Sequence, residues 1–344
     1  MEETEETIMM SDSYADGFLL FLSRKLDCAS PLPSRSSIYR VPETLRRYNE
    51  MAPNLVSIGP FHHGRPRLQA MEEMKMWYLK CLLRKLTPDN GLAYLINIIK
   101  NQEIFCRDCY EERVPLGSDE FVEMMLVDGC FIIELLRKQV HLSPVEDDDA
   151  IFRTPRMLST ITNDLLLVEN QLPWRVLDCL FEVTRVDDDD HGNPSLRELA
   201  CHVFQNPAFQ QSFESISSLN CEKEFESSHL LETVRNFVVQ PWVEDWEDME
   251  YRTPIPSVSE LLEIGVKFVA ASSNGQLHIT FRNGVMEIPP IIIREDTESF
   301  IRNLIAYEQC LQKPEQCQVT SYAILFSQLI ESVQDVDFLI QRKL

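Results

Sequence analysis

The chain has 344 residues, of which 44% are hydrophobic and 25% are charged. This balance excludes a globally disordered or fibrous protein, because it supplies enough apolar surface for a sizeable core. Asp and Glu number 55 against 32 Lys and Arg, so the formal net charge is −23. A charge of that sign repels the phosphate backbone of nucleic acids, and we therefore expect no nucleic-acid partner.

The N-terminal sequence predicts a short segment that precedes the folded domain. Residues 1–12, MEETEETIMMSD, are expected to be a disordered acidic leader, and residues 13–35 a short helix followed by a linker rich in Pro and Ser. The leader lacks the basic start and apolar stretch of a secretory signal. The ten cysteines are spaced irregularly and most lie in apolar runs, which favours free thiols. Together these features predict a cytoplasmic protein.

Helices dominate the next part of the chain. Residues 38–64 are punctuated by Gly and Pro and predict an irregular loop. Apolar residues at helical spacing then predict helices over residues 68–86, 92–110, 118–138, 160–169 and 173–183. The third of these is apolar on most faces, so we expect it at the centre of the core.

Two acidic runs interrupt the helices, at 146–149 and 187–190. The second run is a candidate boundary between two lobes that would meet near residues 186–194, within one domain over 36–344. Ser195 and Ser257 each precede a glutamate by three residues, which is the capping-box pattern at the start of a helix.

After Gly265 the apolar period changes from helical to two. Together with the tight-turn signal Asn283-Gly284, this alternation predicts a small antiparallel sheet of about three strands near residues 265–294. Helices over 297–310 and from about residue 320 to 344 should complete the chain. The expected fold class is α+β, predominantly α-helical, with a large helical core and this small sheet.

Few patterns in the sequence point to chemistry. Cys106 and Cys109 have the CxxC spacing of redox and zinc sites, but no second pair supplies the four ligands of a zinc site. Packing on one helix face explains the spacing, so we expect no metal and no cofactor. The sequence has no P-loop, no GxSxG and no HExxH.

His62 and His63 lie in the loop rich in Gly and Pro. One of their rings could be a base or a ligand on a shaped loop. The alternative, which we favour, is a loop histidine that is hydrogen-bonded to the backbone.

Four acids lie within very apolar segments: Asp128, Glu134, Asp164 and Glu169. A buried carboxylate is costly unless it is paired, and two such groups together could form a catalytic dyad. We favour a structural role, in which the acids cap helix ends or bind loop amides. The arginines available as partners are Arg137, Arg156, Arg175 and Arg302.

A set of motifs in fixed order resembles one plant family. The motifs are Ile38-Tyr-Arg-Val-Pro42, Val56-Ser-Ile-Gly-Pro-Phe-His-His-Gly64, Met71-Glu-Glu-Met-Lys75, Met125-Leu-Val-Asp-Gly-Cys-Phe-Ile-Ile-Glu134, Asn163-Asp-Leu-Leu-Leu-Val-Glu-Asn-Gln-Leu-Pro173, Ser228-His229-Leu-Leu, Glu263-Ile-Gly-Val-Lys-Phe268, Phe281-Arg-Asn-Gly-Val-Met-Glu-Ile-Pro289 and Asn303-Leu-Ile-Ala-Tyr-Glu-Gln-Cys310. Over residues 36–344 the chain resembles the family called domain of unknown function 247, or uncharacterised protein family 0481.

The resemblance implies a plant protein with no established enzymatic activity. In grasses, members at the self-incompatibility locus resemble pollen-side specificity determinants. Members usually end in one hydrophobic, membrane-spanning segment, and this chain stops at Leu344 without one. We therefore expect no membrane insertion by this chain, and a membrane-anchored cytosolic domain where a longer form carries that segment.

The sequence favours a non-enzymatic recognition or signalling protein that acts through protein–protein binding. Its partner would be another protein with a basic surface, contacted by the two acidic loops. The residues in these loops are Glu146, Asp147, Asp148 and Asp149, and Asp187, Asp188, Asp189 and Asp190. The alternative is an enzyme of unrecognised type that uses a loop histidine and a buried carboxylate.

Overall fold

The computed structural model describes residues 36–43, 45–46, 51–87, 90–185, 194–204, 227–239, 254–271, 277, 279–311 and 317–344. The predicted leader, short helix and linker over residues 1–35 lie outside these ranges, as does the acidic run at 187–190.

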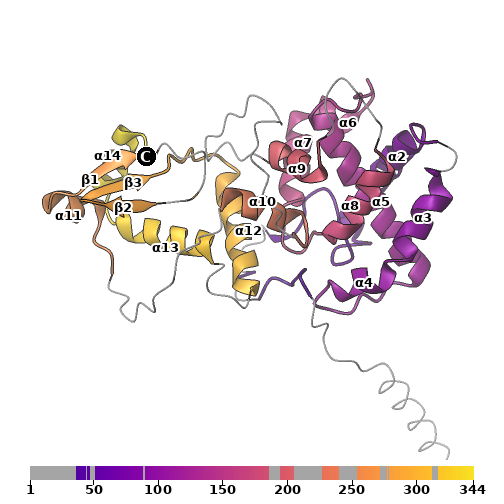
Figure 1. Cartoon of the computed structure of the whole chain (residues 1–344), viewed down its shortest axis with the longest axis horizontal. Helices are drawn as coiled ribbons and strands as arrows, with labels where there is room; N and C mark the ends of the chain where they lie inside the picture. The colour runs from indigo at the N-terminus through magenta and orange to yellow at the C-terminus, as the bar shows by residue number, and fades with distance from the viewer. Residues whose placement is uncertain are drawn as a thin grey trace, which may run out of the picture.

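Helices form most of the described chain, which confirms the predominantly helical α+β class (Figure 1). The helices of the first part are α2 (Ala70–Leu83), α3 (Leu92–Lys100), α4 (Glu103–Asp108), α5 (Ser118–Gln139), α6 (Ala150–Arg153), α7 (Pro155–Asp164), α8 (Trp174–Val183) and α9 (Leu196–Val203), and a 3-10 turn, Pro66–Leu68, precedes α2. The second part contains α10 (Leu230–Val238), α11 (Val258–Glu263), α12 (Thr297–Cys310), α13 (Gln318–Leu329) and α14 (Val333–Arg342). None of the described helices is long and apolar enough to cross a membrane.

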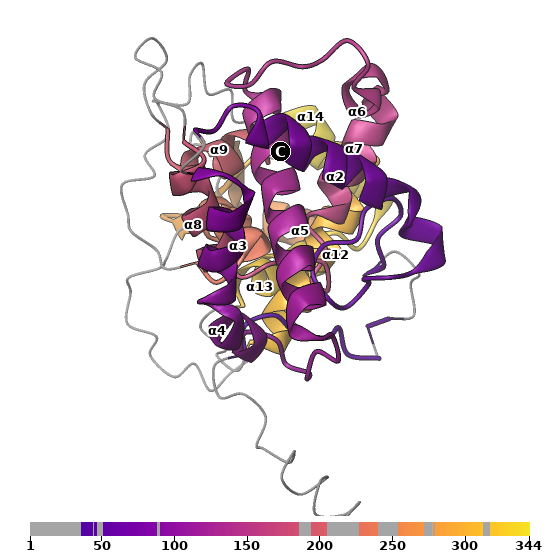
Figure 2. The same cartoon turned by 90° about the vertical axis from the view of Figure 1, so that its right-hand side faces the viewer.

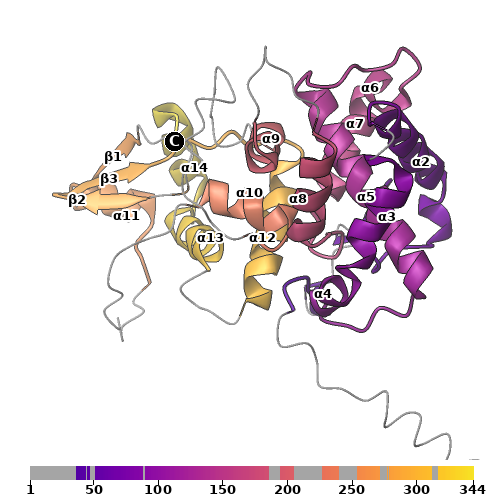
Figure 3. The same ribbon diagram turned by 45° about the vertical axis from the view of Figure 1, so that its right-hand side comes forward.

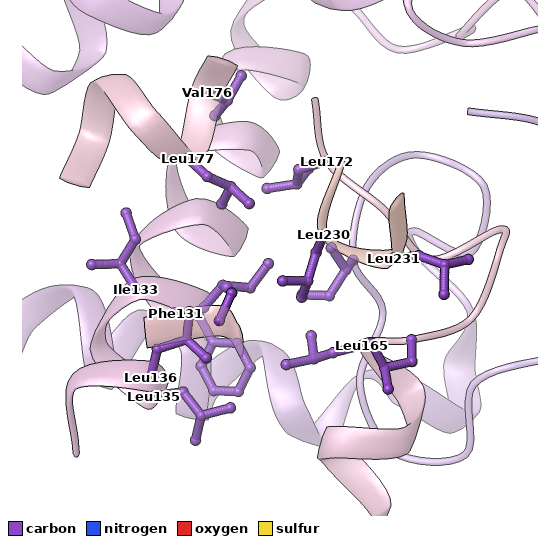
Figure 4. Close-up of a cluster of buried hydrophobic side chains, with 14 of the residues drawn as sticks. Phe131, Ile133, Leu135, Leu136, Leu165, Leu172, Val176, Leu177, Leu230 and Leu231 are labelled. Atoms are coloured by element: carbon purple, nitrogen blue, oxygen red, sulfur yellow. The ribbon is translucent and has the colours of Figure 1, made fainter. Parts of the chain in front are cut away.

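Helix α5 is the centre of the large core, as its apolar sequence predicts. It contacts α2, α3, α4, α8 and α9, and Figure 2 shows it between α2 and α3. Its side chains Phe131, Leu135 and Leu136 are buried together with Leu177 of α8 and Leu230 of α10 (Figure 4). Burial of leucine- and phenylalanine-sized groups stabilises the fold by about 1.5–3 kcal/mol each.

A second hydrophobic cluster lies at the opposite end of the molecule. It joins the sheet to α11, α13 and α14 through Val258, Phe268, Ile288, Leu329 and Leu339. Figures 1 and 3 show the sheet, α11 and α14 at this end, with α10 and α12 between them and the helices around α5. The division into two lobes near 186–194 stays a prediction. On either side of that segment, α8 and α9 both pack on α5.

The small sheet is mixed, whereas the sequence predicted an antiparallel one. Its strands are β1 (Lys267–Ala270), β2 (Thr280–Arg282) and β3 (Val285–Ile288), in the order β1-β3-β2. β2 and β3 form the predicted antiparallel hairpin, but β1 pairs with β3 in parallel. Alternating apolar residues show that a segment is extended and has one buried face, and they carry no information on pairing direction. The antiparallel prediction was therefore right for one strand pair and wrong for the other.

Two predicted helices are each divided into two shorter helices. The segment 92–110 forms two helices that meet at Asn101 and Gln102. The predicted last helix is also two helices, because Ser332 and Asp335 form a capping box that begins α14. The capping boxes predicted at Ser195 and Ser257 are both present.

Replacing Gly284 with valine should destabilise the protein by about 1 kcal/mol or more, because Asn283 and Gly284 have φ values of 52° and 75° in the hairpin turn. A β-branched residue is strained at positive φ, whereas asparagine tolerates it. Urea unfolding should therefore rank wild type and Gly284→Asn above Gly284→Val. Equal stability of all three would show that the hairpin does not depend on this turn.

Candidate functional site

Residues 51–64 form an irregular loop that a buried carboxylate holds in place. Asp164, at the end of α7, accepts hydrogen bonds from the backbone N–H groups of Asn54, Leu55 and Val56 at 2.9, 2.7 and 2.9 Å. Burial raises the pKa of Asp164, and the three amides act in the opposite direction. This arrangement confirms the prediction that such an acid binds loop amides.

The side-chain amide of Asn170 continues this attachment. Its Oδ1 accepts from the N–H of Ile58 at 2.7 Å, and its Nδ2 donates to the carbonyl oxygens of Val56 and Asp164 at 3.1 and 2.9 Å. Asn170 therefore fixes the loop to the end of α7.

Gln171 explains why α7 ends at Asp164, five residues before the predicted stop. Its Nε2 donates to the carbonyl oxygens of Leu165 and Leu167, both at 2.8 Å. These hydrogen bonds satisfy backbone acceptors that a longer helix would have used internally. Its Oε1 accepts from the N–H of Leu231 at 3.0 Å, so the same side chain also joins this corner to α10.

A second buried carboxylate fixes the loop at Gly59. Asp128 of α5 accepts from the N–H of Gly59 at 2.8 Å and forms an ion pair of 2.5 Å with Lys75 of α2. Lys75 also donates to the carbonyl oxygen of Ser57 at 2.8 Å and contacts Glu72 at 2.8 Å. Burial lowers the pKa of Lys75, but the two carboxylates outweigh burial and raise it, so the ammonium stays charged.

Glu169 binds the segment that precedes the loop. Its Oε1 accepts from the N–H of Val41 at 2.9 Å and from Arg46 at 2.6 Å, and its Oε2 accepts from Arg40 at 3.1 Å. The Nε2 atom of His62 lies 3.5 Å from the same Oε2. The fold therefore brings together a predicted loop histidine and a predicted buried acid.

His62 is buried, with 2% of its surface exposed, and neither ring nitrogen has a hydrogen-bond partner in the part of the chain that the structure describes. Its pKa is lowered to about 3, first by burial and then by the charges of Arg65, Arg40, Arg67 and Arg46. His63 is only half-buried, and its Nδ1 likewise lacks a hydrogen-bond partner among the described residues. The predicted backbone hydrogen bond of a loop histidine is therefore absent from the described contacts of His62.

This geometry gives His62 and Glu169 little capacity for proton transfer at neutral pH. An efficient general base has a pKa near the working pH. The pKa of His62, about 3, lies far below neutral pH. Glu169 already accepts hydrogen bonds from two guanidinium groups and one amide. The pair is better suited to hold positive and negative groups in position than to move a proton.

None of the four arginines named as available partners forms an ion pair with a buried acid in the described residues, although the charge of Glu134 acts on Arg137. Asp128 pairs with Lys75, Glu134 with Lys85, and Glu169 with Arg40 and Arg46. The proposed partners have other contacts: Arg137 bonds Thr184, Arg175 lies over the Phe105 ring, Arg302 pairs with Glu298, and Arg156 is exposed.

The acidic loop at 146–149 divides into two parts. Asp149 is buried, accepts from Lys138 at 2.8 Å and from the Tyr78 hydroxyl at 2.9 Å, and caps α6. Glu146 accepts from the same Lys138 at 2.5 Å. Asp147 and Asp148 are exposed. Of the four predicted contact residues in this loop, Asp147 and Asp148 are the fully exposed ones, and Glu146 is partly exposed. The other four, Asp187, Asp188, Asp189 and Asp190, lie outside the described residues.

The CxxC pair is buried in apolar surroundings. Burial raises the pKa of Cys106 to about 12 and that of Cys109 to about 11, so both remain thiols at neutral pH. No disulfide joins any two of the eight cysteines that the structure describes. Within the same described residues, no group of three or more His, Cys, Asp or Glu side chains could hold a metal ion.

Sequence reasoning missed the arginines that surround His62. They are Arg40, Arg46, Arg65 and Arg67, and we call them the His62 arginine cluster. Two of them directly follow the His-His-Gly motif, in Arg65-Pro-Arg67. This short basic segment in an acidic chain is the sequence feature that could have identified the cluster.

Comparisons with known proteins identify the same family that the sequence motifs resemble. The family DUF247, described as plant protein of unknown function, matches residues 38–344. The chain is 28% identical over 336 residues to UPF0481 protein At3g47200 from Arabidopsis thaliana, a match that covers 89% of this chain and 68% of the relative. It is 24% identical over 397 residues to Putative UPF0481 protein At3g02645 from Arabidopsis thaliana, which covers 88% of this chain and 73% of that relative.

No solved structure matches the chain significantly. The family match begins at Ile38, in the segment that Glu169 binds, and ends at Leu344, just after α14. The chain therefore belongs to the DUF247 family of plant proteins of unknown function.

Proposed function

We propose that this protein is a non-enzymatic recognition protein that binds a protein partner through exposed loops on a rigid helical scaffold. The observation that carries the proposal is the use of the candidate reactive groups within the fold. Asp128, Asp164 and Glu169 each hold loop backbone or a cation, and His62 has a pKa of about 3. The acids therefore position loops, which is the arrangement expected where loops carry recognition.

The resemblance to grass self-incompatibility-locus members supports a more specific role. In that role the protein would be a pollen-side determinant that signals by binding another protein. The acidic loops would attract a basic partner surface and accelerate its association, and salt would weaken this attraction. Of the described loop residues, Asp147 and Asp148 fit this role because they are exposed and bind no other residue of the described chain.

The alternative, an enzyme that uses a loop histidine and a buried carboxylate, corresponds to His62 and Glu169. It has weaker support, because Glu169 is held by two arginines and His62 is neutral at physiological pH. His63 is the other candidate base, and no carboxylate contacts it among the described residues.

Replacing Asp147 and Asp148 with asparagine should reduce capture of a protein partner without changing stability. The test is affinity capture from the tissue that expresses the protein, with quantitative mass spectrometry at low and at high salt. The matched control is Glu120→Gln with Glu123→Gln, which removes two exposed charges from α5. We expect one protein to be depleted severalfold in the Asp147/Asp148 variant at low salt only. Equal recovery with all three proteins would overturn the role of this loop.

A further inference from the structure

The His62 arginine cluster is an exception in a strongly acidic protein. Four guanidinium groups lie within electrostatic reach of the His62 ring, in a chain whose net charge is −23. Like charges gathered in one place repel one another unless anions compensate them. Burial and then the charge of Arg67 lower the pKa of Arg65, with smaller contributions from Arg40 and Arg46, while the charge of Glu169 acts in the opposite direction.

The internal carboxylates form close ion pairs with only half of the cluster. Arg46 pairs with Glu169 at 2.6 Å, and Arg40 pairs with Glu169 at 3.1 Å and with Glu112 at 2.9 Å. Neither Arg65 nor Arg67 forms an ion pair with any residue that the structure describes. Among the described residues, the Arg67 side chain donates only to the carbonyl oxygen of Pro53, at 2.9 Å.

The two arginines without an ion pair are accessible, and an unsatisfied polar group lies beside them. Arg65 and Arg67 are both exposed. His62 is 2% exposed, and both of its ring nitrogens lack a hydrogen-bond partner among the described residues. A buried polar group without a partner costs about 1–3 kcal/mol, so such a group needs an explanation, and a bound anion supplies one.

We propose that the His62 arginine cluster is a binding site for a phosphate group, either free inorganic phosphate or a phosphate monoester. The planar guanidinium fork matches the oxygen atoms of phosphate, and two exposed guanidinium groups without an ion pair among the described residues can bind an anion. The neutral imidazole of His62 can add one N–H donor. Glu169 would fix Arg40 and Arg46 at the inner side of the site, and Arg65 and Arg67 would contact the anion. This site does not depend on the proposed protein partner.

Isothermal titration calorimetry of the full chain with sodium phosphate tests the proposal, at pH 7 and with chloride keeping the ionic strength constant. We expect saturable binding with one phosphate per chain. Removing both guanidinium groups, in Arg65→Gln with Arg67→Gln, should weaken binding by about tenfold or more, which corresponds to about 1.4 kcal/mol. The matched control is Arg153→Gln with Arg156→Gln, which removes two exposed arginines on α6 and α7 and should leave binding unchanged.

A second variant keeps the test independent of folding. Because Arg67 supports the loop through Pro53, Arg65→Gln alone is the cleaner substitution, since the Arg65 side chain makes no hydrogen bond to the described residues. Thermal unfolding without phosphate should be the same for this variant and wild type. Absence of saturable phosphate binding by the wild type, or unchanged binding by a folded Arg65→Gln variant, would overturn the proposal.

The source of the phosphate follows from a second titration with a phosphoserine peptide and its unphosphorylated form. Tighter binding of the phosphopeptide than of inorganic phosphate would identify a phosphate carried by a protein. Equal or tighter binding of inorganic phosphate would identify a free ion. Both results support the site, whereas equal binding of the phosphorylated and unphosphorylated peptides together with no binding of inorganic phosphate would contradict it.

Discussion

Replacing Asp128 with asparagine should lower the free energy of unfolding by about 3 kcal/mol or more. The carboxylate is 1% exposed and forms a 2.5 Å ion pair with Lys75, which is completely buried. Its removal leaves an ammonium group in the core with only Glu72 and the Ser57 carbonyl as partners. It also replaces the charged acceptor of the Gly59 N–H with a neutral one. Urea or thermal unfolding of the purified variant measures the loss.

Glu72→Gln is the matched control, because it removes the other carboxylate that contacts the same ammonium group. The Glu72 side chain is 25% exposed, so water can replace part of its interaction with Lys75. Partly exposed ion pairs contribute about 0–1 kcal/mol, and we expect a loss in that range. Equal losses for the two variants would show that the core does not depend on the buried partner in particular.

Local patterns were sufficient to predict the central helix beside the candidate site, but not the bounds of α7 or the presence of α10. Helix α5 is apolar on nearly every face, and 17 of its residues are buried, as expected for a central helix. The capping boxes at Ser195 and Ser257 were also predictable, since a capping box involves residues only three positions apart. Both residues of such an interaction lie within one turn of helix, so the local sequence is enough to identify it.

The ion-pair partners could not be predicted, because they are distant in the sequence. Lys75 and Asp128 are 53 positions apart, and Arg40 and Glu169 are 129 apart. Such pairs depend on how whole helices and loops pack, which one sequence does not reveal. The arginine partners that we expected lay near the acids in the sequence or on helices, whereas Arg40 and Arg46 belong to the irregular segment before α2. The parallel pairing of β1 with β3 was unpredictable for the same reason.

Some residues of the candidate site could be identified from the sequence, but their contacts with one another could not. His62 and Glu169 were both candidates from the sequence, and their 3.5 Å contact appears only in the fold. The cluster around them depends on residues that flank the loop, Arg40 and Arg46 before it and Arg65 and Arg67 after it. A loop rich in Gly and Pro has no fixed period, so its sequence does not show which of its flanking side chains will meet.

Acid should destabilise the protein through His62 before most carboxylates are protonated. The pKa of His62 is lowered from 6.5 to about 3 in the folded chain. Between these values the unfolded chain binds a proton that the folded chain does not, so stability falls as the pH falls. The contribution of His62 is complete above pH 6.5 and is lost at about 1.4 kcal/mol per pH unit, or about 3 kcal/mol by pH 4. Urea unfolding at pH 7, 6, 5 and 4.5 measures this slope.

His229 should act in the same direction over a narrower range, because its pKa is lowered to about 4, chiefly by burial. His62→Gln removes the first titration, and His229→Asn removes the second while keeping a residue that can cap α10, where the His229 ring now accepts from the Glu232 N–H at 3.2 Å. Each variant should have a smaller pH slope than wild type below pH 6.5, even where its stability at pH 7 is lower. The difference in slope separates the titration from a packing defect, because lost packing shifts stability by a similar amount at every pH. An unchanged slope for His62→Gln would mean that His62 is protonated in the folded protein, and its ring would then be a cation bound to Glu169.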